Sequence, residues 1–261
     1  MMNIENLKFN YNGKPVLNGI NVDIREGEIL GILGQNGCGK TTLLKNLNKN
    51  LVPDSGCVIL DDNNLEEMSK KEIARSIAVV PQTNEIRFAF TVRDIVSMGR
   101  MPFMGTFDGE SSKDVDIIND AMEKTGISTF SDRYINTMSG GERQRVIIAR
   151  ALVQNPKILL MDEPTLHLDI NTQFDVLDLI SQLSKENKLT VVIVSHDLSM
   201  VARYCDRVML IKDHEVYAIG TLDEVLTPDN MDTVFGVDAE LITDIKTGKR
   251  TVFLHGSTKR L

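Results

Sequence analysis

The sequence predicts an α/β fold built on a mainly parallel sheet. Short apolar segments of strand length alternate along the chain with helix-like segments. Residues 158–161 and 191–194 are apolar without interruption, as expected of strands covered on both faces of a sheet. The predicted strands are Ile29–Leu33, Ile77–Val80, Ile158–Met161, Thr190–Val194 and Val208–Lys212. The predicted helices are Lys40–Asn48, Lys113–Lys124, Gly141–Leu152 and Asn171–Glu186.

Three regions depart from this alternation. The segments Ile4–Phe9 and Ile20–Ile24 alternate in polarity around turn signals, which predicts an N-terminal antiparallel β-subdomain. Strand signals are sparse from about 85 to 150, which predicts an inserted α-helical subdomain. Residues 1–220 are therefore expected to form one domain, and residues 221–261 a small C-terminal extension. Within that extension we expect a helix near Asp229–Phe235 and two strands around residues 244–249.

Charge and composition exclude several classes of function. The 261 residues include 29 basic and 37 acidic side chains, a formal net charge of −8. Because such a surface repels a polyanion, we do not expect nucleic acid as a partner. No apolar run is long enough to cross a bilayer, and the first residues lack the pattern of a signal peptide. Three cysteines without metal-ligand spacing fit a reducing compartment, so we expect a cytoplasmic protein.

A glycine-rich segment at residues 34–42 matches the phosphate-binding P-loop pattern G-x-x-x-x-G-K-[ST]. A predicted strand precedes it and a predicted helix follows, so backbone N–H groups can converge on phosphate at a helix N-terminus. We expect Lys40 to reach the β- and γ-phosphates and the Thr41 hydroxyl to bind Mg²⁺. Cys38 suits a tight loop because it is small, and a redox role is the alternative. The predicted nucleotide-binding residues are Gly34, Gln35, Asn36, Gly37, Cys38, Gly39, Lys40, Thr41 and Thr42.

A second element of a P-loop nucleoside triphosphatase core follows the apolar strand at 158–161. Asp162 and Glu163 end this strand. The Asp162 carboxylate can hold Mg²⁺ through its water shell, and Glu163 can orient and deprotonate the attacking water. An acidic pair after a strand can also cap the next helix. The P-loop upstream favours the catalytic interpretation.

A second glycine-rich element opens the helix predicted at 141–152. Ser139 is expected to be its N-cap, with Glu142 as the capping-box partner. The adjacent Gly140 and Gly141 leave bare N–H groups that can form a second anion-binding nest. One chain would then hold two phosphate-binding nests but only one Mg²⁺ and water site. A head-to-tail homodimer, in which each nest meets the other chain's nucleotide, resolves this mismatch.

Together these motifs resemble the nucleotide-binding subunits of ABC transporters over essentially the whole chain. The segment SGGE-x-Q at 139–144 is similar to the family's signature motif, with Met138 where leucine is usual. The resemblance implies that Tyr11 stacks on adenine and that Gln82 is the Q-loop residue, near Mg²⁺ or the water. It also implies that Leu168 and Asp169 lie in the D-loop, and that a switch histidine faces the γ-phosphate. That histidine is His196.

Several segments resemble the ATPase subunits of importers for iron-siderophores, haem and cobalamin. They are the run Glu163-Pro164-Thr165-Leu166-His167-Leu168-Asp169-Ile170, the run Met98-Gly99-Arg100-Met101-Pro102, and the tail. The resemblance implies integral membrane permease subunits as partners and an extracytoplasmic substrate-binding protein in the same system. It places the chain on the cytoplasmic face of the membrane, with ATP and Mg²⁺ as cofactors. It also implies Glu163, His196 and Gln82 as catalytic residues and Thr41, Gln82 and Asp162 as metal ligands.

Other classes of protein explain less of the sequence. A soluble ABC ATPase of the cluster-assembly type, or the ATPase of another ABC transporter class, remains an alternative. A P-loop kinase or GTPase would use residues 34–42 but leave 138–144 and His196 without a purpose. A non-catalytic nucleotide-binding regulator would be expected to lack Glu163 or His196, and both are present.

Overall fold

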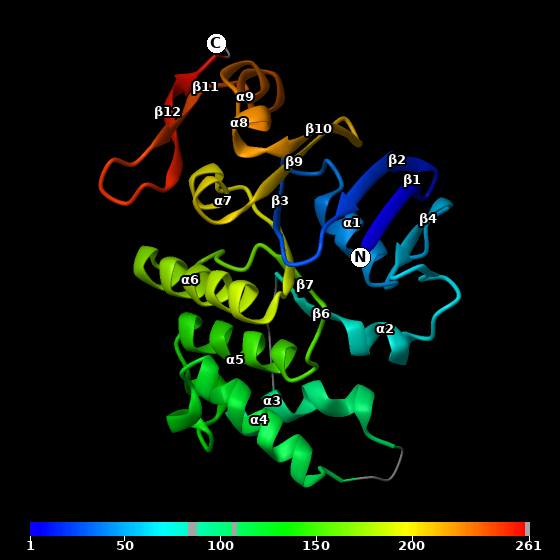
Figure 1. Ribbon diagram of the computed structural model, residues 1–261, viewed down its shortest axis with the longest axis vertical. Coiled ribbons are helices and arrows are strands. Elements are labelled where there is room, and N and C mark those ends of the chain that lie inside the picture. Colours follow the sequence, from blue (N-terminus) through cyan, green and yellow to red (C-terminus); the bar gives the residue numbers. More distant parts are fainter. Residues whose placement is uncertain (83–87, 106–108, 259–261) are drawn as a thin grey trace. The chain divides into compact units, whose positions relative to one another are not determined.

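The computed structural model describes residues 1–82, 88–105 and 109–258 (Figure 1). The chain divides into two compact units, and we describe each by itself. The first unit combines Met1–Met68 with Thr190–Leu261, and the second comprises Ser69–Leu189. The expected division into residues 1–220 and 221–261 differs from this one, and it stays a prediction.

The first unit begins with an antiparallel sheet of strand order β2-β1-β4-β5. Burial alternates along β1, because one face of the sheet packs on the core and the other meets solvent. Asn12 and Gly13, both with positive φ, form the tight turn that joins β1 to β2. The predicted N-terminal antiparallel subdomain is therefore confirmed. Its strands are β1 (Met2–Tyr11), β2 (Lys14–Ile24), β4 (Ser55–Leu60) and β5 (Asn63–Asn64).

The same unit holds the strands that carry the P-loop. Strand β3 (Ile29–Gly34) pairs in parallel with β8 (Thr190–Val194) and with β9 (Arg207–Lys212). All residues of β3 and β8 are buried, as their continuous apolar sequence predicts. Strand β10 (Glu215–Thr221) adds to β9 in antiparallel orientation. Helix α1 (Lys40–Leu47) follows the loop after β3.

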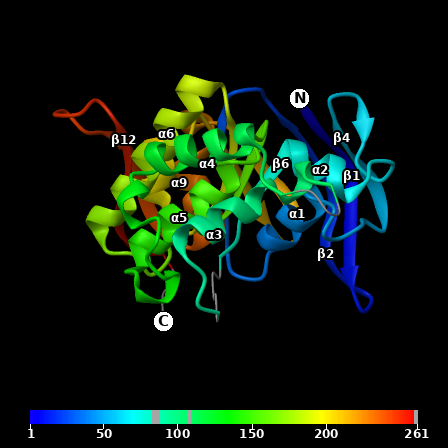
Figure 2. The ribbon, with the colours of Figure 1, turned by 90° about the horizontal axis from the view of Figure 1, so that it is seen from below.

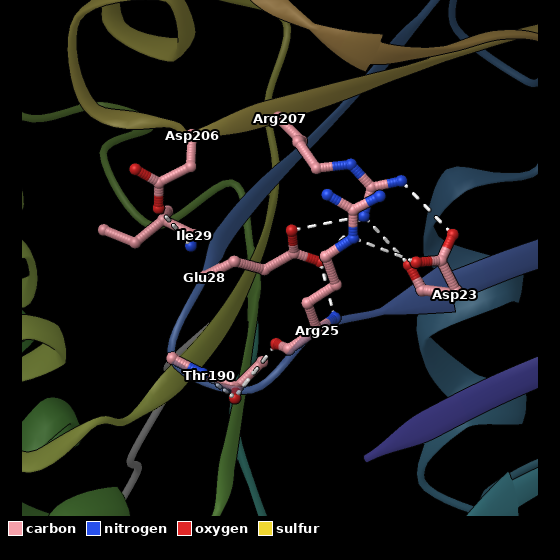
Figure 3. Close-up of polar contacts among 8 residues, drawn as sticks. Asp23, Arg25, Glu28, Ile29, Thr190, Asp206 and Arg207 are labelled. Atoms are coloured by element: carbon pink, nitrogen blue, oxygen red, sulfur yellow. Dashed lines mark hydrogen bonds and ion pairs between the residues drawn. The ribbon is translucent and has the colours of Figure 1, made fainter.

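Charged side chains beside the start of β3 form a cluster around the buried pair of Arg207 and Glu28 (Figure 3). Arg207 lies between Glu28 and Asp23, and its guanidinium Nη1 is 3.2 Å from each Glu28 carboxylate oxygen. Its Nη2 is 3.3 Å from Asp23 Oδ1. The side chains of Arg207 and Glu28 are only 9% and 7% exposed. The cluster ties the antiparallel sheet, through Asp23, to the parallel strands β3 and β9.

The C-terminal part of the first unit is a helix pair followed by a hairpin. Helix α9 is capped at its C-terminus by Gly236, whose left-handed φ of 69° is accessible to glycine without strain. The two strands expected around residues 244–249 lie on either side of those residues, which form the turn between them. The elements are α7 (Leu198–Tyr204), α8 (Leu222–Val225), α9 (Pro228–Phe235), β11 (Val237–Thr243) and β12 (Arg250–Ser257).

The second unit pairs two parallel strands with a group of helices. Strand β6 (Ile77–Val80) pairs with β7 (Ile158–Asp162), and Val80 lies opposite Met161. Within the described residues from 88 to 152 there are helices and a single bridge but no strand, so the predicted helical subdomain is confirmed. Helices α4 and α5 lie side by side (Figure 1 and Figure 2). The helices are α2 (Lys70–Ser76), α3 (Val92–Ser97), α4 (Ser112–Lys124), α5 (Gly140–Leu152) and α6 (Ile170–Asn187), with short 3₁₀ turns at Met98–Phe103, Ser128–Phe130 and Ile135–Thr137.

The Met98–Pro102 segment of the helical region is held by a buried arginine. Arg100 donates from Nε to Asp114 Oδ1 at 2.8 Å and from Nη1 to the Val153 carbonyl at 2.7 Å. Its guanidinium also lies 3.9 Å from the centroid of the Phe103 ring. Arg100 thus connects α4 and the end of α5 to the 3₁₀ turn. These contacts give the arginine of the Met98–Pro102 segment a role in packing. No helix among the described residues is long and apolar enough to cross a membrane.

Candidate nucleotide site

The P-loop lies between β3 and α1 in the first unit, as its sequence predicts. Gly39 occupies the N-cap position of α1 with φ of 111°, a conformation that other residues rarely adopt. A Cβ atom at Gly39 would also lie 2.4 Å from the Val16 carbonyl oxygen. The glycine therefore lets the loop pass close to the antiparallel sheet. The helix N-terminus that follows exposes N–H groups suited to phosphate.

The side chain of Lys40 is buried and fixed by hydrogen bonds within the loop. It is 6% exposed, and its ammonium Nζ donates to the carbonyl oxygens of Gly34 at 2.8 Å and Gln35 at 3.1 Å. The positive charge is thereby held at the centre of the loop, where phosphate oxygens would converge. Thr41 and Thr42 follow in the first turn of α1.

Cys38 is buried within this loop. Burial raises the pKa of the Cys38 thiol, while the nearby charge of Lys40 opposes that rise. Since the thiolate is the reactive form, a raised pKa favours the interpretation of Cys38 as a small residue that fits the loop.

His196 lies in the same unit as the P-loop. It follows β8, and β8 pairs in parallel with β3 so that Val194 lies opposite Ile32. The carboxyl ends of the two adjacent strands, with the P-loop after one and His196 after the other, therefore meet at one edge of the sheet. His196 is exposed, and the next residue, Asp197, caps α7 by accepting a hydrogen bond from Met200 N–H at 3.0 Å. The capping role of Asp197 leaves the predicted role of His196 intact.

Tyr11 ends β1, also in the first unit. Its side chain is 43% exposed, and its ring packs edge-to-face against Phe9 with centroids 4.8 Å apart. An exposed ring held by a neighbour is suited to stack on a flat base.

The acidic pair Asp162 and Glu163 lies at the carboxyl end of β7 in the second unit. Asp162 is 7% exposed, whereas Glu163 is only half-buried. Glu163 has a positive φ of 49°, which is uncommon for a residue other than glycine and turns the chain sharply after the strand. The N-cap of the next helix, α6, is Asp169, so neither acid of the pair caps it.

Gln82 follows β6, the parallel neighbour of β7. Its Nε2 donates a hydrogen bond to Glu163 Oε2 at 3.3 Å. The structure therefore brings together two predicted catalytic residues that are 81 positions apart in the sequence. The reason is topological, because each residue follows the carboxyl end of one of two paired strands.

Ser139 is the N-cap of α5, as predicted. Its hydroxyl accepts from Glu142 N–H at 3.3 Å, and the Glu142 carboxylate accepts from Ser139 N–H at 2.8 Å. This N–H hydrogen bond lowers the pKa of the Glu142 carboxyl, although burial opposes the shift. Ser139 and Gly140 are exposed, so the tip of the helix is open to a ligand.

A contact that the sequence does not predict supports this helix tip. A Cβ atom at Gly141 would lie 2.3 Å from Thr172 Cγ2, so α5 approaches the first turn of α6 as closely as a glycine allows. The Thr172 hydroxyl donates to Asp169 Oδ2 at 2.6 Å, which orients its methyl group towards Gly141. The two adjacent glycines of the motif indicate a close approach of the backbone to another element. The sequence does not identify Thr172 as the residue that lies against them.

The predicted site residues thus form two groups. Tyr11, the P-loop residues and His196 belong to the first unit, whereas Gln82, Ser139–Gly141 and Asp162–Glu163 belong to the second. Each group has the local structure that its motif predicts. The assignment of these residues to nucleotide, Mg²⁺ and water stays a prediction.

Comparisons with known proteins identify the family. The family model described as ABC transporter matches residues 17–166, more than half of the chain. The matched segment includes the P-loop, Gln82, Ser139 and Glu163, and it ends before His196.

Curated relatives and solved structures extend the match to nearly the whole chain. The iron(3+)-hydroxamate import ATP-binding protein FhuC of Bacillus subtilis is 39% identical, over 95% of this chain and 92% of its own length. The petrobactin import ATP-binding protein FpuD of Bacillus anthracis is 36% identical, over 98% and 93%. A chain of a putative metal-chelate type ABC transporter in an inward-facing conformation superposes with a TM-score of 0.85 at 30% identity, covering 97% of this chain and 96% of that one.

The fold and the family match together establish the class of this protein. The predicted fold class, a P-loop nucleoside triphosphatase core with an antiparallel subdomain and a helical subdomain, is confirmed. The family model matches the segment that carries the P-loop, the acidic pair and the second glycine-rich element. The chain therefore belongs to the ABC transporter family, and it is an ATPase of that family.

Proposed function

We propose that this chain powers an importer of an iron-siderophore, haem or cobalamin-type substrate by binding and hydrolysing MgATP as a head-to-tail dimer. The cargo class rests on similarity to relatives described as iron(3+)-hydroxamate, petrobactin and cobalamin import ATP-binding proteins. Permease subunits would hold the chain at the cytoplasmic face of the membrane, and an extracytoplasmic substrate-binding protein would deliver the cargo.

The observation that carries the catalytic part of the proposal is the contact between Gln82 and Glu163 at the ends of β6 and β7. It holds a carboxylate at the edge of a parallel sheet, where ligands of such folds bind. Glu163 would take the proton of the attacking water, and His196 would stabilise charge that develops on the γ-phosphate. Lys40 would neutralise phosphate charge from within the loop.

Oxygen donors of this chain suit a magnesium ion. The Thr41 hydroxyl in the first turn of α1 and the buried carboxylate of Asp162 are hard oxygen ligands of the kind that Mg²⁺ prefers. Because Gln82 donates to Glu163 through its nitrogen, the amide oxygen is the atom that would ligate the ion. Bound there, Mg²⁺ would neutralise negative charge on the β- and γ-phosphates.

The exposed tip of α5 supports the dimeric part of the proposal. Gly140 presents its N–H group and Ser139 its hydroxyl at a helix N-terminus, an arrangement that favours an anion. The γ-phosphate held by a second copy supplies such an anion. A dimeric bacterial ABC transporter cassette is 31% identical to this chain and superposes with a TM-score of 0.74 over 85% of it.

Complementation between two inactive variants tests the shared site. Ser139→Ala should lower turnover while leaving nucleotide affinity of the isolated subunit intact, and Lys40→Ala should abolish tight binding. A mixed dimer combines one intact P-loop with one intact Ser139 tip. It should therefore regain about one active site per two chains. If mixing restores no hydrolysis, the nucleotide is not shared between subunits in this way.

The cargo is tested in the assembled transporter. The chain, its permease and the substrate-binding protein are reconstituted in vesicles, and ATP hydrolysis is measured with ferric hydroxamate, haem or cobalamin added. One of these cargo classes should stimulate hydrolysis and accumulate in the vesicles. Stimulation by none of them, with normal basal hydrolysis, would reject the cargo assignment and retain the ATPase.

A further inference from the structure

The side chain of Gln35 connects the P-loop to the C-terminal part of the chain. Its Nε2 donates a hydrogen bond of 2.7 Å to the carbonyl oxygen of Val234 in α9. The two residues are 199 positions apart, and both lie in the first unit. The sequence pattern predicts Gln35 only as one residue of the phosphate-binding loop.

The acceptor of this bond is a carbonyl that the helix itself does not satisfy. The last four carbonyls of an α-helix have no partner within it, and Val234 is the second-last residue of α9. These carbonyls also carry the negative end of the helix dipole, so an amide donor is favourable there. Gln35 thus caps α9 from the P-loop.

The backbone of Gln35 lies at the centre of the phosphate-binding loop. Its carbonyl oxygen accepts from Lys40 Nζ at 3.1 Å and from Cys38 N–H at 3.3 Å. One residue therefore contacts the C-terminal helix with its side chain and the predicted phosphate-binding lysine with its main chain. A shift of the side chain would be passed to the carbonyl that positions the Lys40 ammonium.

Buried side chains and hydrogen bonds at both ends fix the position of helix α9. Met231 and Val234 are fully buried, and the Thr227 hydroxyl caps the first turn by accepting from Asn230 N–H at 3.3 Å. At the other end, the Gly236 carbonyl accepts from Thr258 N–H at 3.0 Å. The helix is thus fixed at both ends, and the Val234 carbonyl has a defined position.

The C-terminal hairpin contacts helix α7, which follows the predicted switch histidine His196. The Ser199 hydroxyl in α7 donates to the Val252 carbonyl in β12 at 3.1 Å. The Lys249 ammonium lies 4.7 Å from the centroid of the Tyr204 ring, also in α7. Helix α7 begins two residues after His196, so the C-terminal elements reach both the P-loop and the segment that carries the histidine.

We propose that Gln35 is a positioning residue, through which helix α9 holds the P-loop in the conformation that binds nucleotide. The C-terminal residues 222–258 then form part of the ATP-binding machinery rather than a separate appendage. This inference rests on the proposed nucleotide site at residues 34–42. If the contact between Gln35 and α9 favours nucleotide binding, then bound nucleotide must stabilise that contact by the same free energy.

Replacing Gln35 with methionine removes the donor and keeps the length of the side chain. We expect the Kd for a fluorescent ATP analogue to rise about 3- to 10-fold in Gln35→Met, the effect of losing one neutral hydrogen bond. In steady-state assays the KM for ATP should rise by more than kcat falls. Gln182→Met, which makes the same change on the exposed surface of α6, should leave Kd within about twofold.

Hydrogen exchange tests the reciprocal effect without measuring activity. Adding ADP or an ATP analogue to the wild-type chain should slow amide exchange at residues 232–236, the last turn of α9 and its C-cap. In Gln35→Met, at nucleotide concentrations that saturate the P-loop, this slowing should be lost. Retained protection of α9 in the saturated variant would overturn the inference.

Loosening the helix instead of the glutamine gives an independent test. Met231→Ala removes a fully buried side chain of α9 and should raise the Kd for nucleotide in the wild-type background. In the Gln35→Met background Met231→Ala should not raise the Kd further, because the hydrogen bond from residue 35 to the Val234 carbonyl is already absent. Additive effects would contradict the proposed route. Failure of the wild-type chain to bind any nucleotide would reject the proposed nucleotide site, whereas equal Kd values for wild type and Gln35→Met would reject only this inference.

Discussion

The side-chain nitrogen of Gln82 lies 3.3 Å from a carboxylate oxygen of Glu163, across the ends of the paired strands β6 and β7. The bond orients a half-buried carboxylate that also has an uncommon positive φ. A general base must be held within hydrogen-bond reach of the proton that it takes. The contact therefore joins the candidate base at the end of β7 to the predicted Q-loop residue at the end of β6.

Exchanging Glu163 for glutamine should separate ATP binding from hydrolysis. The amide keeps the size of the side chain but cannot accept the water's proton, so kcat should fall about 10²- to 10⁴-fold. ATP binding should persist, and the ATP-bound dimer should accumulate on gel filtration. Glu186→Gln, the same change at the exposed end of α6, should hydrolyse ATP normally. Hydrolysis by Glu163→Gln within tenfold of wild type would remove this residue from the proposed role.

The buried pair of Arg100 and Asp114 predicts a pH-dependent stability. Hydrogen bonds from Ser111 and from Arg100 lower the pKa of Asp114 from 3.8 to about 2. Because the folded-state pKa lies below the unfolded value, the pair contributes its full stability above about pH 4 and loses it as the pH falls towards 2. The contribution at pH 7 is about 2 kcal/mol.

Urea unfolding of Asp114→Asn measures this contribution. At pH 7 the variant should lose at least about 2 kcal/mol, since Arg100 also keeps a buried charge without its carboxylate. The difference from wild type should shrink below pH 4. Asp120→Asn, in the same helix, removes an exposed partner of Lys124 and should cost less than about 1 kcal/mol. A difference between Asp114→Asn and wild type that is constant from pH 7 to pH 2.5 would contradict the assignment.

The cluster in Figure 3 predicts a large penalty for removing one buried charge. In Arg207→Met, Glu28 remains buried without its ion-pair partner, which should cost about 3 kcal/mol or more. Adding Glu28→Gln should recover part of this loss, because it removes the uncompensated charge. Arg25→Met provides the control, since the Arg25 side chain contacts the same Asp23 but is 64% exposed. Equal unfolding free energies for the Arg207 and Arg25 variants would contradict the prediction.

The sequence predicts the local motifs of this protein better than the contacts between them. The P-loop, the strand before Asp162 and the capping box at Ser139 each lie within a few residues, so their spacing carries the information. Strands β4 and β10 were not predicted, although residues 57–60 and 216–219 are apolar without interruption; both strands are partly exposed, and a short apolar run alone does not separate a strand from other structure. Contacts such as those from Gln35 to Val234 and from Gly141 to Thr172 join distant positions, and only the fold brings them together.

The approach of Gly141 to Thr172 predicts a substitution that can be rescued. In Gly141→Ala the added methyl group would lie 2.3 Å from Thr172 Cγ2, so the tip of α5 must shift. We expect lower thermal stability and a loss of turnover, with little change in nucleotide affinity of the isolated subunit. Gly140→Ala should be milder for stability, because its new methyl group would meet Leu168 at 3.5 Å, an ordinary contact distance.

Adding Thr172→Ser to Gly141→Ala removes the clashing methyl group and keeps the hydroxyl that bonds to Asp169. The double variant should therefore regain both thermal stability and turnover, because the new methyl group points into the subunit and leaves the exposed face of the helix tip open. Thermal unfolding and ATPase assays on the four variants of this cycle measure the coupling between the two positions. Recovery of stability without turnover would mean that the Gly141 position itself must approach the phosphate more closely than an alanine permits. Recovery of neither would mean that the contact with Thr172 is not what excludes a side chain at this position.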